Sequence, residues 1–284
     1  MKLGSSDIAK LYLGADEATK VYFGADQVYP AAGPSRPAIV QAGLSYWLDP
    51  LYDWNSGTPT DYVSTETGTV NGSLTTEAET GAIIGWDGLN ESSTTTWIDF
   101  TNVITDLEPV GSGTYEFTQT YWLYIPDLRA NSRAWITIDH KRTSDAYNHA
   151  LILRNEYGNR TEFLLSLPPT GEPNLQVPIG GEAPYNGKWF AFAVTKTAGG
   201  GFKIWRRRYD DSSWTTATSG DASISRPYTA GNPYRIGKTI NGTRSDRYTL
   251  PTGAKLGPIK WYNVELSEAD LNTNFDAEKA RFTP

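Results

Sequence analysis

The first residues to consider are pairs of carboxylates whose spacing could support glycoside hydrolysis. Glu77 and Glu79 are separated by one residue, and so are Asp106 and Glu108. Because side chains alternate across a β-strand, either pair would share one face of a strand. A retaining glycosidase needs such a pair, with one carboxylate as nucleophile and the other as acid. Both pairs stand among loop-like residues, so the sequence favours solvated loops over a catalytic pair.

Other catalytic chemistry has few candidate residues. The chain has two histidines, His140 and His149, and no cysteine, which excludes disulfides and thiolate metal sites and argues against a multi-histidine zinc site. A Ser-His-Asp triad would be expected with a Gly-x-Ser-x-Gly turn, which does not occur. The run 199–201 of three glycines joins two strand-like segments, whereas a phosphate-binding loop joins a strand to a helix. The protein is therefore predicted not to be an enzyme.

Three tryptophans in loop-like stretches are candidates for binding a sugar. An exposed indole can stack on a sugar ring while a neighbouring Asp or Asn bonds to the hydroxyls. Most aromatic residues are nevertheless expected in the core. The candidate ligand-binding residues are Trp54, Trp86, Asp87 and Trp214.

Acidic loop residues raise the question of a calcium site. Calcium prefers oxygen ligands, and carboxylates in loops supply them. No spaced calcium-binding motif is present, so no cofactor is predicted and Ca²⁺ remains an alternative. The acidic residues concerned are Asp87, Asp145, Asp210, Asp211 and Asp246.

Charge and hydropathy exclude several classes of partner. The formal net charge is −7, from 25 basic and 32 acidic residues, which gives no general attraction to nucleic acid or to anionic lipid. Arg206 and Arg208 would share one face of a strand. We interpret them as part of a solvated edge strand, whose charge discourages edge-to-edge pairing. No apolar run is long enough to span a membrane. The first residues lack an apolar signal core, so synthesis in a cytoplasm without a cleaved signal is expected.

The elements that would position these residues are mostly short strands. The chain of 284 residues has 27 Gly, 17 Pro and 13% aromatic residues, a composition that suits many strands and turns. Residues 114–125 are predicted to form the strongest strand pair, with Phe117, Tyr121, Leu123 and Ile125 alternating. Residues 188–195 and 201–209 are predicted to form a hairpin, because two strand-like runs flank glycines.

The C-terminal stretch predicts a strand followed by a helix. Residues 259–264 alternate apolar and polar side chains, which indicates a half-buried strand. Ser267 is expected to cap a helix that runs to Arg281, because its hydroxyl can accept from a backbone N–H of the first turn. Leu271, Phe275 and Phe282 are expected to face inward.

Three motifs resemble one family. Residues 257–275 read Gly-x-Ile-x-x-Tyr-Asn-x-x-Leu-Ser-x-x-Asp-Leu-x-x-Asn-Phe, residues 43–49 read Gly-Leu-Ser-Tyr-Trp-Leu-Asp, and residues 187–194 read Gly-Lys-Trp-Phe-Ala-Phe-Ala-Val. In this order they are similar to the laminin-G-like, concanavalin A-like jelly-roll superfamily. The resemblance implies one such domain over residues 37–284, with Trp122 or Trp135 as a buried tryptophan of a central strand. The family shares a fold rather than an activity, and the carboxylate motif of its hydrolases is missing here.

Residues 1–30 differ from the rest because they repeat. Residues 10–19 (KLYLGADEAT) align with residues 20–29 (KVYFGADQVY), and Gly4, Gly14 and Gly24 recur every ten residues. Such a unit cannot bury its apolar face alone, so it needs a partner. The repeats resemble short units that open many bacteriophage virion proteins; a hairpin that packs on its own domain is the alternative. The residues expected to mediate tethering or assembly are Leu11, Tyr12, Leu13, Val21, Tyr22 and Phe23.

Together these patterns predict an all-β protein: a two-sheet antiparallel jelly-roll sandwich with an N-terminal β-repeat extension, a Pro-rich linker at residues 31–36 and a short C-terminal helix. The expected function is that of a non-enzymatic bacteriophage virion protein, such as a capsid decoration, tail appendage or fibre component. It would be present in several copies, attach to other virion proteins through residues 1–30, and display its sandwich to host-surface glycans or proteins. The alternatives are a bacterial carbohydrate-binding module and a diverged glycoside hydrolase.

Overall fold

The chain divides into two compact units, Met1–Ala38 and Ile39–Pro284. The computed structural model describes the strands within residues 2–29 and 135–178, and residues 36–88, 95–100, 116–126, 187–199, 201–218, 234–238 and 249–283. Residues 31–35 of the predicted linker lie outside the described residues.

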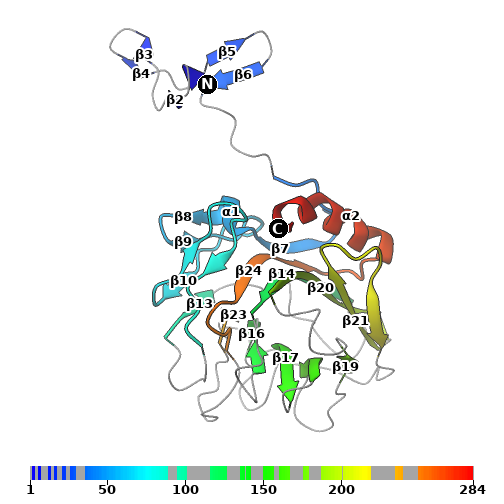
Figure 1. Ribbon diagram of the computed structural model, residues 1–284. Helices are drawn as coiled ribbons and strands as arrows, with labels where there is room; N and C mark the ends of the chain where they lie inside the picture. Colours follow the sequence, from blue (N-terminus) through cyan, green and yellow to red (C-terminus); the bar gives the residue numbers. More distant parts are fainter. Residues whose placement is uncertain are drawn as a thin grey trace. The chain divides into compact units, whose positions relative to one another are not determined.

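The strands described in the first unit form three two-stranded antiparallel hairpins, one for each copy of the repeat (Figure 1). The pairs Leu3 with Ser6, Leu13 with Asp16 and Phe23 with Asp26 have the same register, each leaving two residues between the paired positions. The hairpins are β1 (Lys2–Leu3) with β2 (Ser6–Asp7), β3 (Tyr12–Leu13) with β4 (Asp16–Glu17), and β5 (Val21–Phe23) with β6 (Asp26–Tyr29).

Of the proposed tethering residues, Tyr12 and Leu13 lie on β3, and Val21, Tyr22 and Phe23 form β5. Leu11 lies outside the described residues. Their contact with a partner stays a prediction.

The second unit is built around an eight-stranded antiparallel sheet. Its order is β11 (Thr75–Thr76), β12 (Ile83–Ile84), β24 (Lys255–Tyr262), β14 (Phe117–Ile125), β20 (Lys188–Lys196), β21 (Phe202–Arg208) and β22 (Thr215–Thr218), with β7 (Leu44–Leu48) also paired to β24. Residues 114–125 were predicted as a strand pair, but they contribute the single nine-residue strand β14. The predicted hairpin of residues 188–195 and 201–209 is confirmed as β20 and β21.

The second unit also contains two four-stranded antiparallel sheets among its described residues. One has the order β10 (Thr69–Asn71), β13 (Trp97–Phe100), β23 (Tyr234–Ile236) and β16 (Asp139–Lys141). The other has the order β15 (Trp135–Thr137), β17 (Ala150–Glu156), β18 (Arg160–Ser166) and β19 (Leu175–Pro178). A short helix α1 (Pro50–Asp53) and a hairpin of β8 (Trp54–Asn55) and β9 (Thr58–Pro59) follow β7.

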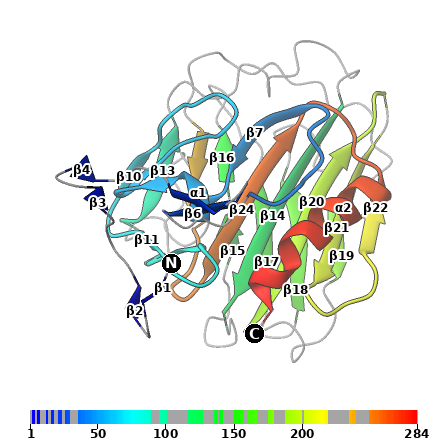
Figure 2. The ribbon, with the colours of Figure 1, turned by 90° about the horizontal axis from the view of Figure 1, so that it is seen from above.

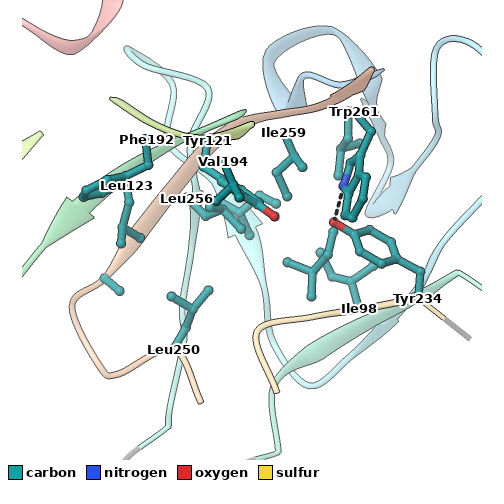
Figure 3. Close-up of a cluster of buried hydrophobic side chains, with 14 of the residues drawn as sticks. Ile98, Tyr121, Leu123, Phe192, Val194, Tyr234, Leu250, Leu256, Ile259 and Trp261 are labelled. Atoms are coloured by element: carbon teal, nitrogen blue, oxygen red, sulfur yellow. Dashed lines mark hydrogen bonds between the residues drawn. The ribbon is translucent and has the colours of Figure 1, made fainter. Parts of the chain in front are cut away.

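The main core lies between the eight-stranded sheet and the sheet that contains β13 (Figure 3). Alternation along β14 directs Phe117, Tyr121, Leu123 and Ile125 into this core, as the sequence predicted. From the opposite sheet come Ile98, Phe100, Tyr234 and Ile236. The indole Nε1 of Trp261 donates to the hydroxyl of Tyr234 across 3.4 Å and so links the two sheets. This packing of two antiparallel sheets is a β-sandwich.

The other face of the eight-stranded sheet is covered by α2 (Glu268–Glu278) and the 3₁₀ turn η2 (Lys279–Phe282), as Figure 2 shows. Leu271, Phe275 and Phe282 are buried there, as predicted, and the Trp122 ring stacks on Phe282 with 4.4 Å between centroids. Trp122 is thus the buried tryptophan of the central strand. Trp135, the other candidate, lies on β15, and its side chain is not among the described parts of the chain. The predicted half-buried strand at residues 259–264 is wrong in one respect: because α2 covers the second face, even Lys260 is 1% exposed.

Side-chain hydrogen bonds fix α2 to the sheet. Ser267 and Asp270 form a capping box at its start, in which each side chain accepts from the other residue's backbone N–H. Lys260 Nζ donates to Glu278 Oε2 across 2.7 Å, and Trp122 Nε1 donates to the same oxygen across 2.9 Å. Arg281 donates to both carboxylate oxygens of Asp49, at 2.7 and 2.9 Å. The helix is therefore an integral layer of the unit.

The pairing of β24 with β14 shifts register between Tyr121 and Leu123. The shift falls at Gly257 and Pro258, where proline has no backbone N–H to donate to the ladder. A side chain at Gly257 would place its Cβ 2.8 Å from the Cβ of Trp122 and 3.0 Å from the Phe282 ring. The glycine therefore lets Phe282 of the 3₁₀ turn η2 approach the sheet closely.

Among the described residues, no helix is long and apolar enough to cross a membrane.

A candidate ligand-binding face on strand β13

Strand β13 presents two of its four residues away from the core. Ile98 and Phe100 are fully buried between the sheets, whereas Trp97 and Asp99 are half-buried on the opposite face. Alternation of side chains explains the division. An indole, the largest apolar side chain, therefore lies on the outward face of the smaller sheet.

Asp99 fixes the groups around this indole. Its Oδ2 accepts from Trp97 Nε1 across 2.9 Å and from an Nη atom of Arg235 across 3.0 Å, and its Oδ1 accepts from Arg235 Nε across 2.7 Å. Arg235 is the β23 residue directly opposite Asp99 in the pairing register. The two-pronged contact sets the guanidinium plane, and the indole hydrogen bond sets the ring orientation.

Two cationic groups approach the same indole. The Nζ of Lys238 lies 4.5 Å from a Trp97 ring centroid, and the Cζ of Arg235 lies 5.1 Å from it. Both distances are within the range of cation–π attraction. The aromatic surface and positive charge are thus brought together at one point of the sheet.

Strand β10 adds polar groups beside the indole. Asn71 is paired with Trp97 in the register, and Thr69 is paired with Asp99. At the opposite edge of the sheet, β16 pairs with β23 so that His140 is opposite Arg235 in the register. We refer to Asn71, Trp97, Asp99, Arg235 and Lys238 as the Trp97 cluster.

Asp87 accepts hydrogen bonds from the two residues that directly precede β13. Its carboxylate accepts from the backbone N–H and the hydroxyl of both Thr95 and Thr96. Partial burial, the largest single influence, would raise the pKa of Asp87, but these hydrogen bonds together outweigh it and lower the pKa below its ordinary value. The carboxylate is therefore held ionised as a brace for the start of β13.

The three tryptophans that were predicted to bind a sugar lie in different surroundings. Trp86 is 2% exposed, and its Nε1 donates to the carbonyl of Ile83, so the indole has no face available to a sugar. Trp54 is half-buried on β8 and packs against the main core. Trp214 is half-buried, donates to Asn272 Oδ1 and contacts Phe275 of α2. The structure does not bring these three together.

The carboxylates considered for hydrolysis do not form a catalytic pair among the described residues. Glu77 pairs with Lys255 and accepts from the Thr80 hydroxyl, while Glu79 is exposed. Partial burial acts to raise the pKa of Glu77, but the hydrogen bonds from Lys255 and Thr80 and the lysine charge outweigh it, so the pKa is lowered. A general acid needs the opposite shift. Asp106, Glu108 and His149 lie outside the described residues, and so does the side chain of His140.

The predicted acidic loop residues do not converge. Asp210 and Asp211 both pair with Arg208, and Asp87 bonds to Thr95 and Thr96 as above. Asp145 and Asp246 lie outside the described residues. Within the part of the chain that the structure describes, no three His, Asp or Glu side chains are grouped to hold a metal ion.

The sequence analysis did not select Trp97, although a signal was present. In Trp97-Ile-Asp-Phe100 two aromatic residues occupy opposite faces of one strand, so one of them must leave the core. The polar partner Asp99 falls on the same face as Trp97, which indicates that this face is the outward one. Arg235 and Lys238 could not be associated with it from sequence, because their strand lies far along the chain.

No family model and no curated protein matches the chain. Solved structures do match. The binding domain of botulinum neurotoxin serotype D is 12% identical with a TM-score of 0.56, over 83% of this chain and 52% of that one. Botulinum neurotoxin type C, described as dependent on two ganglioside molecules to enter cells, is 13% identical with a TM-score of 0.53, over 83% and 51%. A Trypanosoma rangeli sialidase is 13% identical with a TM-score of 0.52, over 87% and 34%.

At these identities the likeness concerns the fold. It agrees with the predicted all-β jelly-roll sandwich of the concanavalin A-like kind. The chain spans about half the length of the neurotoxin structures it matches.

Proposed function

We propose that the protein is a non-enzymatic, lectin-like component of a bacteriophage virion that binds host-surface glycans through the Trp97 cluster. The observation that carries the glycan-binding part is the half-buried Trp97, whose indole is fixed by Asp99 on the outward face of the sheet. An indole held in one orientation loses little conformational entropy when a sugar stacks on it.

The polar groups of the cluster suit a sugar as well. Asn71 offers an amide that can both donate and accept, and Asp99 and Arg235 offer an acceptor and a donor beside the ring. A few placed polar groups around an aromatic surface are typical of small-molecule sites. The neurotoxin type C structure, described with ganglioside molecules, supports a glycan ligand by analogy of fold.

A binding role without catalysis is supported by the carboxylates. Of the candidate pair Glu77 and Glu79, Glu79 is exposed, and the pKa of Glu77 is lowered, which is unsuited to an acid. The Trp97 cluster contains the single carboxylate Asp99, which Arg235 and Trp97 engage. Double displacement at a sugar needs two carboxyl groups.

The attachment part of the proposal depends on the first unit. Three separate two-stranded hairpins cannot form a core, and an isolated hairpin is at best marginally stable in water. A partner surface that pairs with or covers the hairpins would supply the missing burial. Repeats of this kind resemble those of phage virion proteins, so the partner we propose is another virion protein.

Binding of the full-length protein to a glycan array tests the first part. We expect Trp97→Ala to weaken binding of any glycan hit by about tenfold or more, because stacking and apolar burial are lost. Tyr62→Ala is the control, since Tyr62 is an exposed aromatic residue outside the Trp97 cluster. Binding that survives in Trp97→Ala would move the site elsewhere, and no binding by the wild-type protein would overturn the glycan proposal.

Deletion of residues 1–36 tests the second part. The remaining chain keeps the main core and the packing of α2 and η2 on the eight-stranded sheet, so it should fold. We expect it to be missing from purified particles in a complementation assay, with circular dichroism as the folding control. Normal incorporation of the truncated protein would refute the tether.

A further inference from the structure

The chemistry of the Trp97 cluster identifies the class of sugar. We infer that it prefers acidic saccharides, in which a carboxylate or sulfate group meets Lys238 and Arg235 while the sugar ring lies on Trp97. The inference rests on the proposed glycan-binding function and makes it more specific.

Two cationic side chains lie near the same indole ring. Lys238 Nζ and Arg235 Cζ lie 4.5 and 5.1 Å from Trp97 ring centroids. A platform for neutral sugars needs an aromatic face and hydrogen-bonding groups, but it gains nothing from two nearby cationic side chains. An anionic group on the ligand would gain charge-assisted hydrogen bonds from both.

The two cationic side chains differ in how far a carboxylate already engages them. Asp99 occupies the Nε and one Nη of Arg235, so the guanidinium is held in place and its charge is largely balanced. Lys238 carries an ammonium with three donors on a flexible stem, so it can add a ligand oxygen to the contacts it already makes. Lys238 is therefore the group expected to discriminate between acidic and neutral sugars.

The positive side chains of the Trp97 cluster contrast with the negative net charge of the whole chain. The chain has a net charge of −7, so its overall field repels an anionic ligand at long range. Affinity for an acidic sugar must then come from short-range contacts in a locally cationic place. Lys238 and Arg235 are both half-buried, which reduces the screening of such contacts by water and salt.

The test compares matched ligands on matched variants. Full-length protein is titrated by calorimetry with lactose, sialyllactose and 3-sulfo-lactose, which share a neutral core and differ in the anionic group. For wild-type protein we expect the two acidic ligands to bind about three- to tenfold more tightly than lactose. Lys238→Gln should remove most of this preference, so that the affinities for the two acidic ligands fall toward the affinity for lactose.

Lys203→Gln serves as the control, because Lys203 also places its Nζ over an indole, 3.5 Å from the Trp205 ring centroid, outside the cluster. It should keep the preference. Equal or tighter binding of lactose, with loss in Trp97→Ala, would overturn the acidic preference and leave the glycan-binding function standing. A preference that survives Lys238→Gln would overturn the role of Lys238. Failure of all three ligands, followed by no hit on a broad array, would overturn the proposed function itself.

Discussion

Replacing Lys260 by methionine should be among the most damaging single changes in the second unit. The side chains of Lys260 and Glu278 are each 1% exposed, and 2.7 Å separates the Lys260 Nζ from the Glu278 carboxylate. Lys260→Met keeps the length of the side chain but leaves the carboxylate buried without its ion-pair partner. Breaking a buried pair in this way costs about 3–5 kcal/mol.

The loss should depend on pH in a defined direction. Burial raises the pKa of Glu278, the Lys260 charge opposes the rise, and the Asp49 charge adds to it. Without Lys260 the main opposing influence is gone, so the pKa of Glu278 rises further. A carboxyl whose folded pKa lies above its unfolded value favours folding below the unfolded pKa and opposes it as the pH rises through the folded pKa. The destabilisation should therefore be larger at neutral pH than at pH 5, and it should shrink as the pH falls toward the unfolded pKa.

The double variant Lys260→Met/Glu278→Gln isolates this effect. Glutamine cannot ionise but retains an oxygen that can accept from Trp122 Nε1, as Glu278 does across 2.9 Å. Urea unfolding followed by tryptophan fluorescence gives the free energy of unfolding of both variants between about pH 5 and pH 8. We expect the double variant to be the more stable at pH 7 and the difference to narrow toward pH 5. A cost below about 1 kcal/mol for Lys260→Met at pH 7, or a difference that does not change with pH, would refute the reasoning.

Two further substitutions test local features of the fold. Gly237 has φ +88°, and a Cβ there would lie 2.2 Å from the Trp86 ring, so Gly237→Ala should cost about 3 kcal/mol or more. Gly199→Ala, at φ +65° with no atom within 4 Å, should cost only about 1–2 kcal/mol in the same urea titration; equal losses would contradict the close packing. Ser267→Ala removes the N-cap of α2 and should cost about 1 kcal/mol, while exposed Ser213→Ala should cost almost nothing. An unchanged urea midpoint for Ser267→Ala would show that packing alone fixes the start of the helix.

Local patterns in the sequence were sufficient to predict the inward-facing residues of β14 and the start of the C-terminal helix. Alternation predicted which residues of β14 enter the core, because a strand with one face in a core must alternate. Ser267 predicted the start of α2, because a cap is a property of a few consecutive residues. Both depend only on contacts within a short stretch of chain.

Features that depend on distant segments could not be predicted. Lys260 looked like a solvent-facing residue, yet α2 covers it, and the pattern of β24 alone contains no sign of that cover. Trp86 stands in a loop-like stretch, but Gly237, far along the chain, leaves room for its ring in the core. The Trp97 cluster likewise joins β10, β13 and β23, which come together only in the folded sheet.

The pairing that the three N-terminal hairpins share next to their turns has a consequence for how such a protein can change over time. Each hairpin pairs only within its own ten-residue period, so duplication or loss of one whole period leaves the pairing of the others intact. Insertions of five residues would instead separate a strand from its mate. Natural variants should therefore differ in leader length by multiples of ten residues, and a gain of one period would add one more hairpin of the same kind.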